Sequence, residues 1–274
     1  MNKSSLNLNE FKRCFVEKKL SKSEVARKFN ISRRSVVRLM KKERINTEDA
    51  WTKNYDIKLN EFQKEVLYGT LLGDGCLFIY PTSKNPSLLM YHSISQKMYI
   101  QMKLNIFKDF VYNSKLKTAK RKKGKRVYFR TCCHEEFYPI YKDFYKDKTK
   151  IVTKKILDQL TPLSVAFWFM DDGSRCKNRG LAIHTNSFTL NEVEMICQWF
   201  YDKFNVITKP QKRKENQWVV FFSNKTSKEF VDIIIPYVCM SMRYKFKGIF
   251  FKNPQRLYAI PFVNEKLTGT EDIV

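Results

Sequence analysis

The sequence contains no long apolar run, no closely spaced cysteine pair of the zinc-binding kind and few histidines. No uninterrupted apolar stretch approaches the roughly 18 residues that span a bilayer, and residues 1–20 carry charges throughout, so neither a membrane helix nor a secretory signal is expected. The histidines His92, His134 and His184 are too dispersed for a zinc site. Seven cysteines, an odd number with no Cys-x-x-Cys pair, indicate reduced thiols in an intracellular protein.

Acidic residues are also scarce relative to basic ones. Lysine and arginine number 52 against 27 aspartates and glutamates, which gives a formal net charge of +25 and an isoelectric point near 9.7. The composition is 43% hydrophobic and 15% aromatic, which is typical of a folded chain rather than a disordered one. A basic excess of this size on a folded chain predicts a polyanionic partner, most often nucleic acid; the alternative is a solubility bias.

Two apolar, helix-like runs end in the same short acidic turn. Leu163–Ser174 reads LSVAFWFMDDGS, and the weaker copy Leu67–Gly75 reads LYGTLLGDG, so Asp172 and Asp74 each precede a glycine. A charge beside so much apolar surface is unfavourable unless it has a purpose. We predict that the two runs pack side by side and bring the two carboxylates together to hold a divalent metal ion. The alternative is that each Asp-Gly pair is only the turn that ends a helix.

The two runs begin two copies of one plan. Each is followed by strands, a helix, a basic hairpin, a further helix and a lysine, and 98 residues separate Asp74 from Asp172. This regularity indicates an internal duplication of about one hundred residues. Lys150 follows the first aspartate by 76 residues and Lys245 follows the second by 73, so these two lysines are predicted to lie beside the carboxylates and stabilise charge.

The amino-terminal residues follow a different pattern. Asn9–Lys18 has helical spacing, Ser21 and Glu24 fit a capping box, and Ser32 is expected to cap a further helix. A helix, a short turn and a helix are typical of a helix-turn-helix DNA-binding unit, although a plain helical hairpin with a solvated basic face is the alternative. The second helix would present four residues to the major groove: Arg33, Arg34, Ser35 and Arg38.

Two basic hairpins are the remaining feature. Residues 115–131 and 209–222 combine lysine and arginine with aromatic strand residues, and alternate side chains on such strands can face bases or phosphates. The basic side chains expected to contact DNA are Lys117, Lys120, Arg121, Lys123, Lys125, Arg126 and Arg130 in the first hairpin and Lys209, Lys212, Arg213 and Lys214 in the second.

The two acidic runs resemble the signature helices of the single-chain LAGLIDADG homing endonucleases. Leu160–Ser174, followed by HTNSFTLNEVEMICQWFYDKF, is especially similar to the intron-encoded subfamily, and the resemblance covers about residues 58–253. It implies an α+β fold, namely a duplicated αββαββα core with pseudo-twofold symmetry and two antiparallel DNA-binding sheets, here preceded by a small all-α helix-turn-helix. It also implies a site-specific, metal-dependent double-strand break in a long DNA target that leaves short 3′ overhangs.

The domains expected on this basis are four. They are the helix-turn-helix at residues 1–45, a polar linker at 46–58, the first LAGLIDADG half at 59–155 and the second half at 156–274.

By motif position, the resemblance implies a metal site that holds Mg²⁺ or Mn²⁺. Its aspartates match Asp74 and Asp172, and the main-chain carbonyls of Gly73 and Asp171 would assist them. The carboxylate of Asp171 is not expected to be the principal ligand.

The resemblance also implies a basic pocket around this site. Lys245 matches one of the family's lysines, and Lys150 matches the other more loosely, because Thr153 stands where the family often has proline. Lys148 is the alternative to Lys150 in the first half.

Three functions follow from the resemblance. The first is a DNA endonuclease that acts as a monomer on double-stranded DNA and has no membrane partner. The alternatives are a maturase that binds its own intron RNA and a DNA-binding regulator with an inactive nuclease core.

The setting of the protein is predicted from its ends and its cysteines. The chain begins with Met1 and lacks a terminal His-Asn splice junction, so we expect a free-standing or intron-encoded protein rather than an intein. We expect a reducing compartment that contains DNA, either bacterial or phage-infected cytoplasm or, as the alternative, an organelle.

Overall fold

The protein, as a computed structural model, is described here for residues 7–18, 20, 22–43, 45, 57–81, 83–111, 115–121, 124–176 and 180–247. The chain divides into two compact units between Ile57 and Lys58. Each unit is built on its own core. Among the described residues, no helix is long and apolar enough to cross a membrane.

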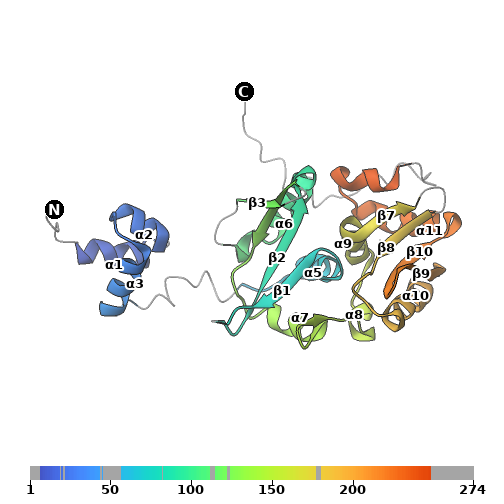
Figure 1. The fold of residues 1–274 in the computed structure, drawn as a ribbon, viewed down its shortest axis with the longest axis horizontal. Coiled ribbons are helices and arrows are strands. Elements are labelled where there is room, and N and C mark those ends of the chain that lie inside the picture. Colours follow the sequence, from blue (N-terminus) through green and yellow to red (C-terminus); the bar gives the residue numbers. More distant parts are fainter. Residues whose placement is uncertain are drawn as a thin grey trace, which may run out of the picture. The chain divides into compact units, whose positions relative to one another are not determined.

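The first unit is a bundle of three short helices (blue in Figure 1). The helices are α1 (Leu8–Val16), α2 (Lys22–Lys28) and α3 (Arg33–Lys42). Ser32 caps α3 as predicted, because its hydroxyl accepts a hydrogen bond of 3.0 Å from the backbone N–H of Ser35. The predicted capping residue Ser21 lies outside the described residues. The buried core side chains come from all three helices and are Phe11, Cys14, Phe15, Val25, Ala26, Val36 and Met40.

The second unit contains two copies of one αββαββα arrangement. The first copy consists of α5 (Glu61–Leu72), β1 (Gly75–Ile79), β2 (Pro86–Ser93), α6 (Lys97–Ile106), β3 (Lys117–Arg121), β4 (Gly124–Arg130) and α7 (Phe137–Phe144). The second consists of α9 (Pro162–Asp172), β7 (Gly173–Cys176), β8 (Gly180–His184), α10 (Leu190–Phe204), β9 (Thr208–Lys214), β10 (Gln217–Phe222) and α11 (Asn224–Ile234).

Short elements join the two copies and complete them. The joining elements are β5 (Tyr145–Lys146), β6 (Thr149–Lys150) and α8 (Lys154–Asp158). The 3₁₀ helices are η1 (Ile94–Gln96), η2 (Lys108–Phe110), η3 (Ile235–Tyr237) and η4 (Met240–Phe246).

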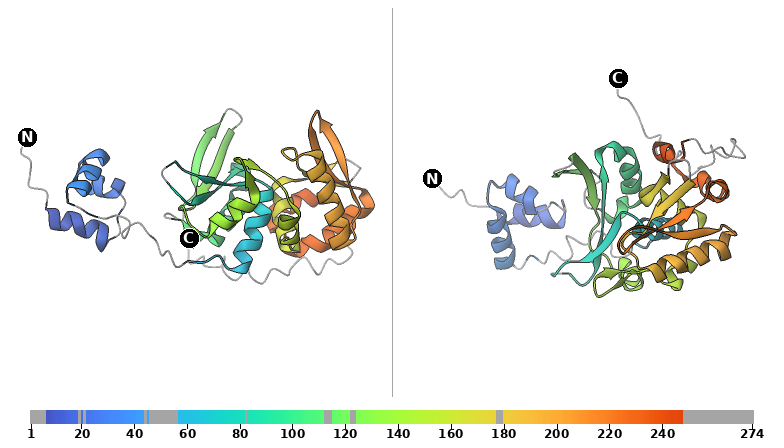
Figure 2. Two further views of the ribbon diagram at one scale, coloured as in Figure 1. Left: turned by 90° about the horizontal axis from the view of Figure 1, so that it is seen from below. Right: turned by 45° about the vertical axis from the view of Figure 1, so that its right-hand side comes forward.

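The two sheets have the same antiparallel strand order. The order is β1-β2-β4-β3 in the first copy and β7-β8-β10-β9 in the second, so the predicted duplication is confirmed. Helices α5 and α9 lie between the two sheets (Figure 1). The left view of Figure 2 shows the hairpin β3–β4 in green and the hairpin β9–β10 in orange rising from the same side of this unit.

Side-chain caps define the ends of the main helices. Asn60 and Gln63 form a capping box at the start of α5, and Thr189 and Glu192 form another at the start of α10. Each box satisfies two backbone N–H groups that have no partner inside the helix. Asn205 ends α10 in the left-handed conformation, with φ 53°, which asparagine adopts more readily than most residues.

Glycines on α5 allow the two central helices to touch backbone to backbone. A methyl group at Gly69 would lie 2.0 Å from the carbonyl oxygen of Ser164, and one at Gly73 would lie 2.5 Å from the Cβ atom of Asp171. Helix α9 is buried on every side from Ser164 to Asp171, as expected for a helix enclosed between two sheets. This packing brings the carboxyl ends of α5 and α9 to the same place.

Candidate active site

The two aspartates that follow the apolar runs lie at the adjoining ends of α5 and α9. Asp74 lies two residues beyond the end of α5 with 42% of its side-chain surface exposed, whereas Asp172 is the last residue of α9 and is partly buried. Burial, then the charge of Asp74 and that of Asp171, raise the pKa of Asp172 to about 7. Partial burial and the charge of Asp171 likewise raise the pKa of Asp74. The site therefore gathers negative charge at the adjoining ends of the two helices.

Two lysines approach the aspartates from opposite halves. Lys150 donates hydrogen bonds to the carbonyls of Gly75, at 2.9 Å, and Gly73, at 3.3 Å. Lys245 donates to the carbonyls of Asp171, at 2.9 Å, and Phe169, at 3.4 Å. Each lysine thus contacts the carbonyl that immediately precedes an aspartate, Asp74 or Asp172. Burial lowers the pKa of both lysines.

The structure distinguishes the two lysines that the sequence left as alternatives in the first half. Lys148 lies at the turn between β5 and β6 with φ 64° and an exposed side chain. Lys150, on β6, is the one whose ammonium group reaches the end of α5. The two carbonyls expected to assist the metal, those of Gly73 and Asp171, are the acceptors of the two lysines.

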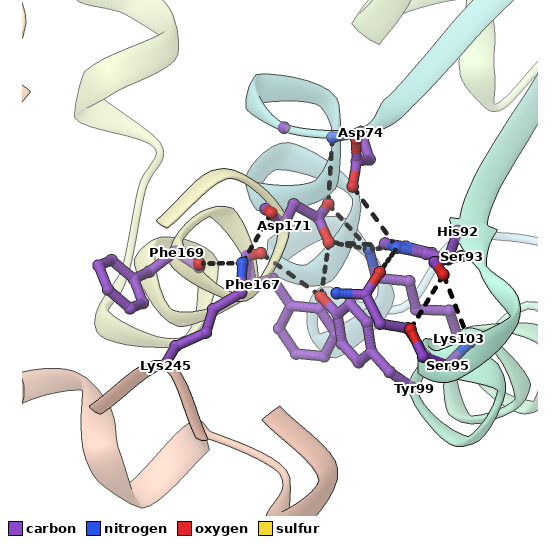
Figure 3. A network of polar contacts seen from close by, with 12 residues as sticks. Asp74, His92, Ser93, Ser95, Tyr99, Lys103, Phe167, Phe169, Asp171 and Lys245 are labelled. Carbon is purple, nitrogen blue, oxygen red and sulfur yellow. Dashed lines mark hydrogen bonds and ion pairs between the residues drawn. The ribbon is translucent and has the colours of Figure 1, made fainter. Parts of the chain in front are cut away.

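A buried ion pair lies directly behind this site (Figure 3). Asp171 and Lys103 have no exposed side-chain surface, and the ammonium nitrogen of Lys103 lies 2.6 and 2.8 Å from the two carboxylate oxygens. The Tyr99 hydroxyl donates to the same carboxylate at 2.8 Å. The backbone N–H of Asp74 donates to it at 3.3 Å. Asp171 therefore joins α9 of the second copy to α6 and to the end of α5.

His92 completes this network in a neutral state. Burial and then the charge of Lys103 lower the pKa of His92 to about 4. The Lys103 ammonium lies 3.5 Å from Nε2, which makes Nε2 an acceptor and assigns the ring proton to Nδ1. Nδ1 in turn lies 3.2 Å from the amide oxygen of Gln96 and 3.5 Å from the carboxylate of Asp74.

Two combinations of these groups are candidates for metal binding. Ligand-type atoms of Asp74, His92 and Asp171 lie within 4.8 Å of one another. However, Lys103 occupies both oxygens of Asp171, and its ammonium stands where a cation would bind. Among the described residues, no hydrogen bond or ion pair engages the carboxylate of Asp172. The pair Asp74 and Asp172 therefore fits a hard divalent cation better, because carboxylate and carbonyl oxygens are the ligands that Mg²⁺ prefers.

The duplicated fold and its paired aspartates agree with a known family. The LAGLIDADG DNA endonuclease family matches residues 64–230, which span both signature helices and both sheets. The chain belongs to this family. The resemblance predicted from the two apolar runs is thereby confirmed, as is the α+β class with its duplicated core.

Similar proteins include an intron-encoded endonuclease, an mRNA maturase and a homing endonuclease. The chain is 29% identical over 198 residues to "Probable intron-encoded endonuclease 1" of Wickerhamomyces canadensis, covering 68% of this chain and 84% of that protein. It is 29% identical over 200 residues to "Cytochrome b mRNA maturase bI2" of Debaryomyces hansenii, covering 70% and 76% respectively. Among solved structures, the homing endonuclease I-WcaI bound to its DNA recognition sequence superposes with a TM-score of 0.64 at 27% identity, covering 72% of this chain and 89% of that one.

The first LAGLIDADG sheet separates the predicted DNA-contacting residues between its two faces. Strand register places Lys117 opposite Tyr128 and Ala119 opposite Arg126, so these side chains lie on the face away from buried Val127. Tyr91 stacks on Tyr128 on this face, with ring centroids 5.0 Å apart. An open face with basic and aromatic side chains suits a nucleic-acid surface.

The other basic residues of this hairpin differ in position. Arg130 shares the open face and packs over the Tyr80 ring, 5.0 Å from its centroid. Lys120 and Lys125 lie opposite each other in the strand register near the exposed tip. Their side chains are on the other face of the sheet, the face of Val127. Arg121 ends β3, and Lys123 lies outside the described residues.

The second sheet presents its predicted residues on the edge strand β9. Lys209, Lys212, Arg213 and Lys214 are all exposed. Lys209 lies over the Phe221 ring and Lys212 over the Trp218 ring, 5.9 and 6.0 Å from the ring centroids. A register shift beside Trp218 adds a residue to the ladder near the turn.

The residues predicted to read DNA in the amino-terminal unit lie on α3. Arg33, Arg34 and Arg38 are exposed, whereas Ser35 is partly buried and its hydroxyl lies 2.8 Å from that of Ser32. The three arginines therefore present exposed cationic groups on this helix, and Ser35 serves the cap.

The sequence did not indicate that Lys103 and Tyr99 belong to the site. They occupy α6 at positions typical of ordinary helix residues, and in the sequence His92 is only one of three dispersed histidines. A lysine on the buried face of an otherwise apolar helix was the one available signal, because lysine is almost never fully buried unless it is paired.

The raised pKa of Asp172 makes a prediction about stability without metal. An unfolded aspartate has a pKa near 3.9, so the contribution of this carboxyl to stability is fully present below about pH 4 and is lost as the pH rises through about 7. We expect Asp172→Asn to raise the free energy of unfolding at pH 8 by on the order of 2 kcal/mol, with the gain shrinking toward pH 5. Thermal or urea unfolding in EDTA measures it. The matched control is Asp158→Asn, at an exposed position on α8, and an equal gain at both pH values would contradict the prediction.

Proposed function

We propose that this LAGLIDADG DNA endonuclease cuts both strands of a long duplex target, as a monomer, through a divalent-metal centre on Asp74 and Asp172. The observation that carries the proposal is the convergence of these carboxylates at the ends of two packed helices. The chain supplies one such helix end from each half, so a single copy provides one carboxylate for each strand of a duplex.

The metal proposed is Mg²⁺ or Mn²⁺. The donor set of carboxylates, assisted by the carbonyls of Gly73 and Asp171, consists of hard oxygen atoms and fits these ions. When bound, the ion supplies Lewis acidity at the scissile phosphate and lowers the pKa of water. A bound cation also relieves the repulsion that raises the pKa of Asp172.

The proposed role of Lys150 and Lys245 is to stabilise negative charge on the phosphates. Both ammonium groups are held at the ends of α5 and α9 by backbone carbonyls, so little reorganisation is needed when the substrate binds. Burial also lowers the pKa of both lysines, which makes proton release from them easier than from an exposed lysine.

The proposed DNA path follows the open faces of the two sheets. The hairpins β3–β4 and β9–β10 rise from one side of the unit and carry exposed lysine and arginine (Figure 2). These side chains would bind phosphates and base edges on either side of the cut, which we expect to leave short 3′ overhangs. The three exposed arginines of α3 would lengthen the footprint as a helix-turn-helix.

The proposed activity is tested on the uninterrupted insertion locus. This DNA joins the two sequences that flank the intron, or other inserted element, in which the protein is encoded. Incubation of a plasmid carrying this locus with the full chain and Mg²⁺ should give a linear product with short 3′ overhangs, mapped by end sequencing. A scrambled locus of equal composition is the control. Absence of cleavage of the locus in both Mg²⁺ and Mn²⁺ would contradict the proposal.

A second function, in RNA splicing, is supported by relatives that are named maturases. The Debaryomyces hansenii protein that is 29% identical to this chain is named a cytochrome b mRNA maturase. A maturase would accelerate splicing of its own intron RNA, which an in vitro splicing assay measures with and without Asp74→Asn. The third function, a regulator with an inactive core, is less favoured because both aspartates and both lysines are present at the helix ends.

The relatives also bear on where the protein acts. The Debaryomyces hansenii relative is named a cytochrome b mRNA maturase, and this favours the organelle over bacterial or phage-infected cytoplasm. We therefore propose an organelle that contains DNA.

A further inference from the structure

The two halves of the site differ at the residue before each aspartate. Because Asp74 corresponds to Asp172, Gly73 corresponds to Asp171. One half therefore has no side chain at this position, and the other has a fully buried carboxylate. Gly73 packs directly against Asp171, since a methyl group there would lie 2.5 Å from its Cβ atom. A larger residue at position 73 would displace this carboxylate.

The backbone of the two aspartates is held by different means. Asp172 is the last residue of α9, so the helix itself orients its peptide group. Asp74 lies beyond the end of α5, and its N–H is bound by the carboxylate of Asp171 at 3.3 Å. A side chain of the second half thus accepts the hydrogen bond that α5, which ends two residues earlier than α9, does not provide.

The residues that support the site also differ between the two halves, as the strand register shows. Gly75 pairs with Met90, and Gly173 pairs with Ile183, so His92 corresponds to Thr185. The hydroxyl of Thr185 donates to the carbonyl of Trp218, within its own sheet, at 2.9 Å. His92 instead lies 3.5 Å from the Asp74 carboxylate and 3.5 Å from the Lys103 ammonium.

Stability alone does not account for the buried pair. Apolar residues of similar volume in place of a buried ion pair often leave a protein equally stable or more stable. The charged pair instead orients the Asp171 carboxylate. The three protons of the Lys103 ammonium face the two oxygens of Asp171 and Nε2 of His92. These contacts fix the carboxylate that holds the Asp74 peptide.

We propose that Asp171, held by Lys103 and Tyr99, is a positioning residue for Asp74. The centre at Asp74, which cuts one strand, then depends on this network. The centre at Asp172, which cuts the other strand, is held by its helix instead. The role rests on the proposed cleavage activity. Loss of the network would disturb the centre at Asp74 and leave the peptide of Asp172 in its helix. A change confined to one centre distinguishes positioning from general support of the fold.

The test compares two double variants of the full chain. Lys103→Met with Asp171→Leu removes the charges and the acceptor for the Asp74 N–H while keeping the volume. Lys103→Met with Asp171→Asn removes the charges but keeps an amide oxygen as acceptor. The target locus, labelled on one strand or on the other, gives the rate at which each strand is cut. Electron paramagnetic resonance gives the affinity of the protein–DNA complex for Mn²⁺.

We expect the leucine variant to change the ratio of the two nicking rates by about tenfold or more and to weaken Mn²⁺ binding by a similar factor, because supporting residues behind metal ligands commonly contribute that much. The asparagine variant should restore both quantities toward those of the unaltered protein. Equal slowing of both strands, or no restoration by asparagine, would overturn the positioning role.

A third variant covers the case in which the leucine variant does not fold. Tyr99→Phe removes one hydrogen bond to Asp171 and keeps the ring, so it should shift the strand ratio in the same direction by a smaller factor. An unchanged ratio would overturn the role. If the unaltered protein cuts neither strand, the proposed activity fails; if it cuts both and the ratio never changes, only the positioning role fails.

Discussion

Asp74→Asn and Asp172→Asn are each expected to reduce cleavage of the target by about 10³-fold, because a metal ion contributes several kcal/mol to stabilisation of charge in phosphate hydrolysis. The amide keeps the size of the side chain but is a much weaker ligand for a hard cation. Binding of the target should change little, since most affinity comes from phosphate contacts along the sheets. Single-turnover cleavage and gel-shift titration measure the two quantities separately.

The control for both aspartate variants is Asp158→Asn, which makes the same chemical change at an exposed position on α8. It should cut at the rate of the unaltered protein. Cleavage by Asp74→Asn or Asp172→Asn within about threefold of that rate would contradict the metal centre, because an essential ligand contributes far more than this. Loss of cleavage with retained acceleration of RNA splicing in either variant would show that a maturase function does not depend on this centre.

Removal of residues 1–57 is expected to weaken binding of the target by about 10²-fold while leaving the cut position unchanged, because a second tethered module raises affinity through its effective concentration. The division between the units falls after Ile57, and the core of each unit is separate, so the remaining chain keeps both halves of the site. Gel-shift titration measures the affinity, and primer extension locates the cut. A shifted cut would contradict the proposed role of the amino-terminal unit.

A charge variant tests the same role in the full-length chain. We would replace the three exposed arginines of α3, Arg33, Arg34 and Arg38, by glutamine. The slope of the logarithm of the binding constant against the logarithm of the salt concentration should then become less steep by about one unit for each phosphate contact that is lost. The control is Arg13→Gln, whose side chain lies on α1 and pairs with Glu17 at 2.9 Å. An equal effect of the control would indicate a general effect of charge rather than a specific contact by α3.

The order of elements was readable from the sequence because it depends on local patterns. Apolar runs that end in Asp-Gly, capping residues such as Thr189 with Glu192, and strand residues beside basic turns each follow from neighbouring residues. The near-equal intervals from Asp74 to Lys150 and from Asp172 to Lys245 reflect the duplication, and the structure places both lysines against the helix ends.

The face on which each basic side chain lies was only partly predictable. All of the hairpin residues were grouped as DNA-contacting, yet the strand register places Lys117 and Arg126 on the open face and Lys120 and Lys125 on the other. A shift of one residue in register exchanges the two faces, and composition alone does not specify it.

The sequence by itself determined the family, the duplication and the pair of aspartates, since these are encoded in contiguous motifs. Only the tertiary structure showed that Asp171 is neutralised by Lys103, 68 residues earlier in the chain, and that this contact holds the peptide of Asp74. The physical reason is that a buried charge requires a partner, but any of many lysines can supply it. Which one does so depends on how α6 packs against α9, and that packing is a property of the folded chain.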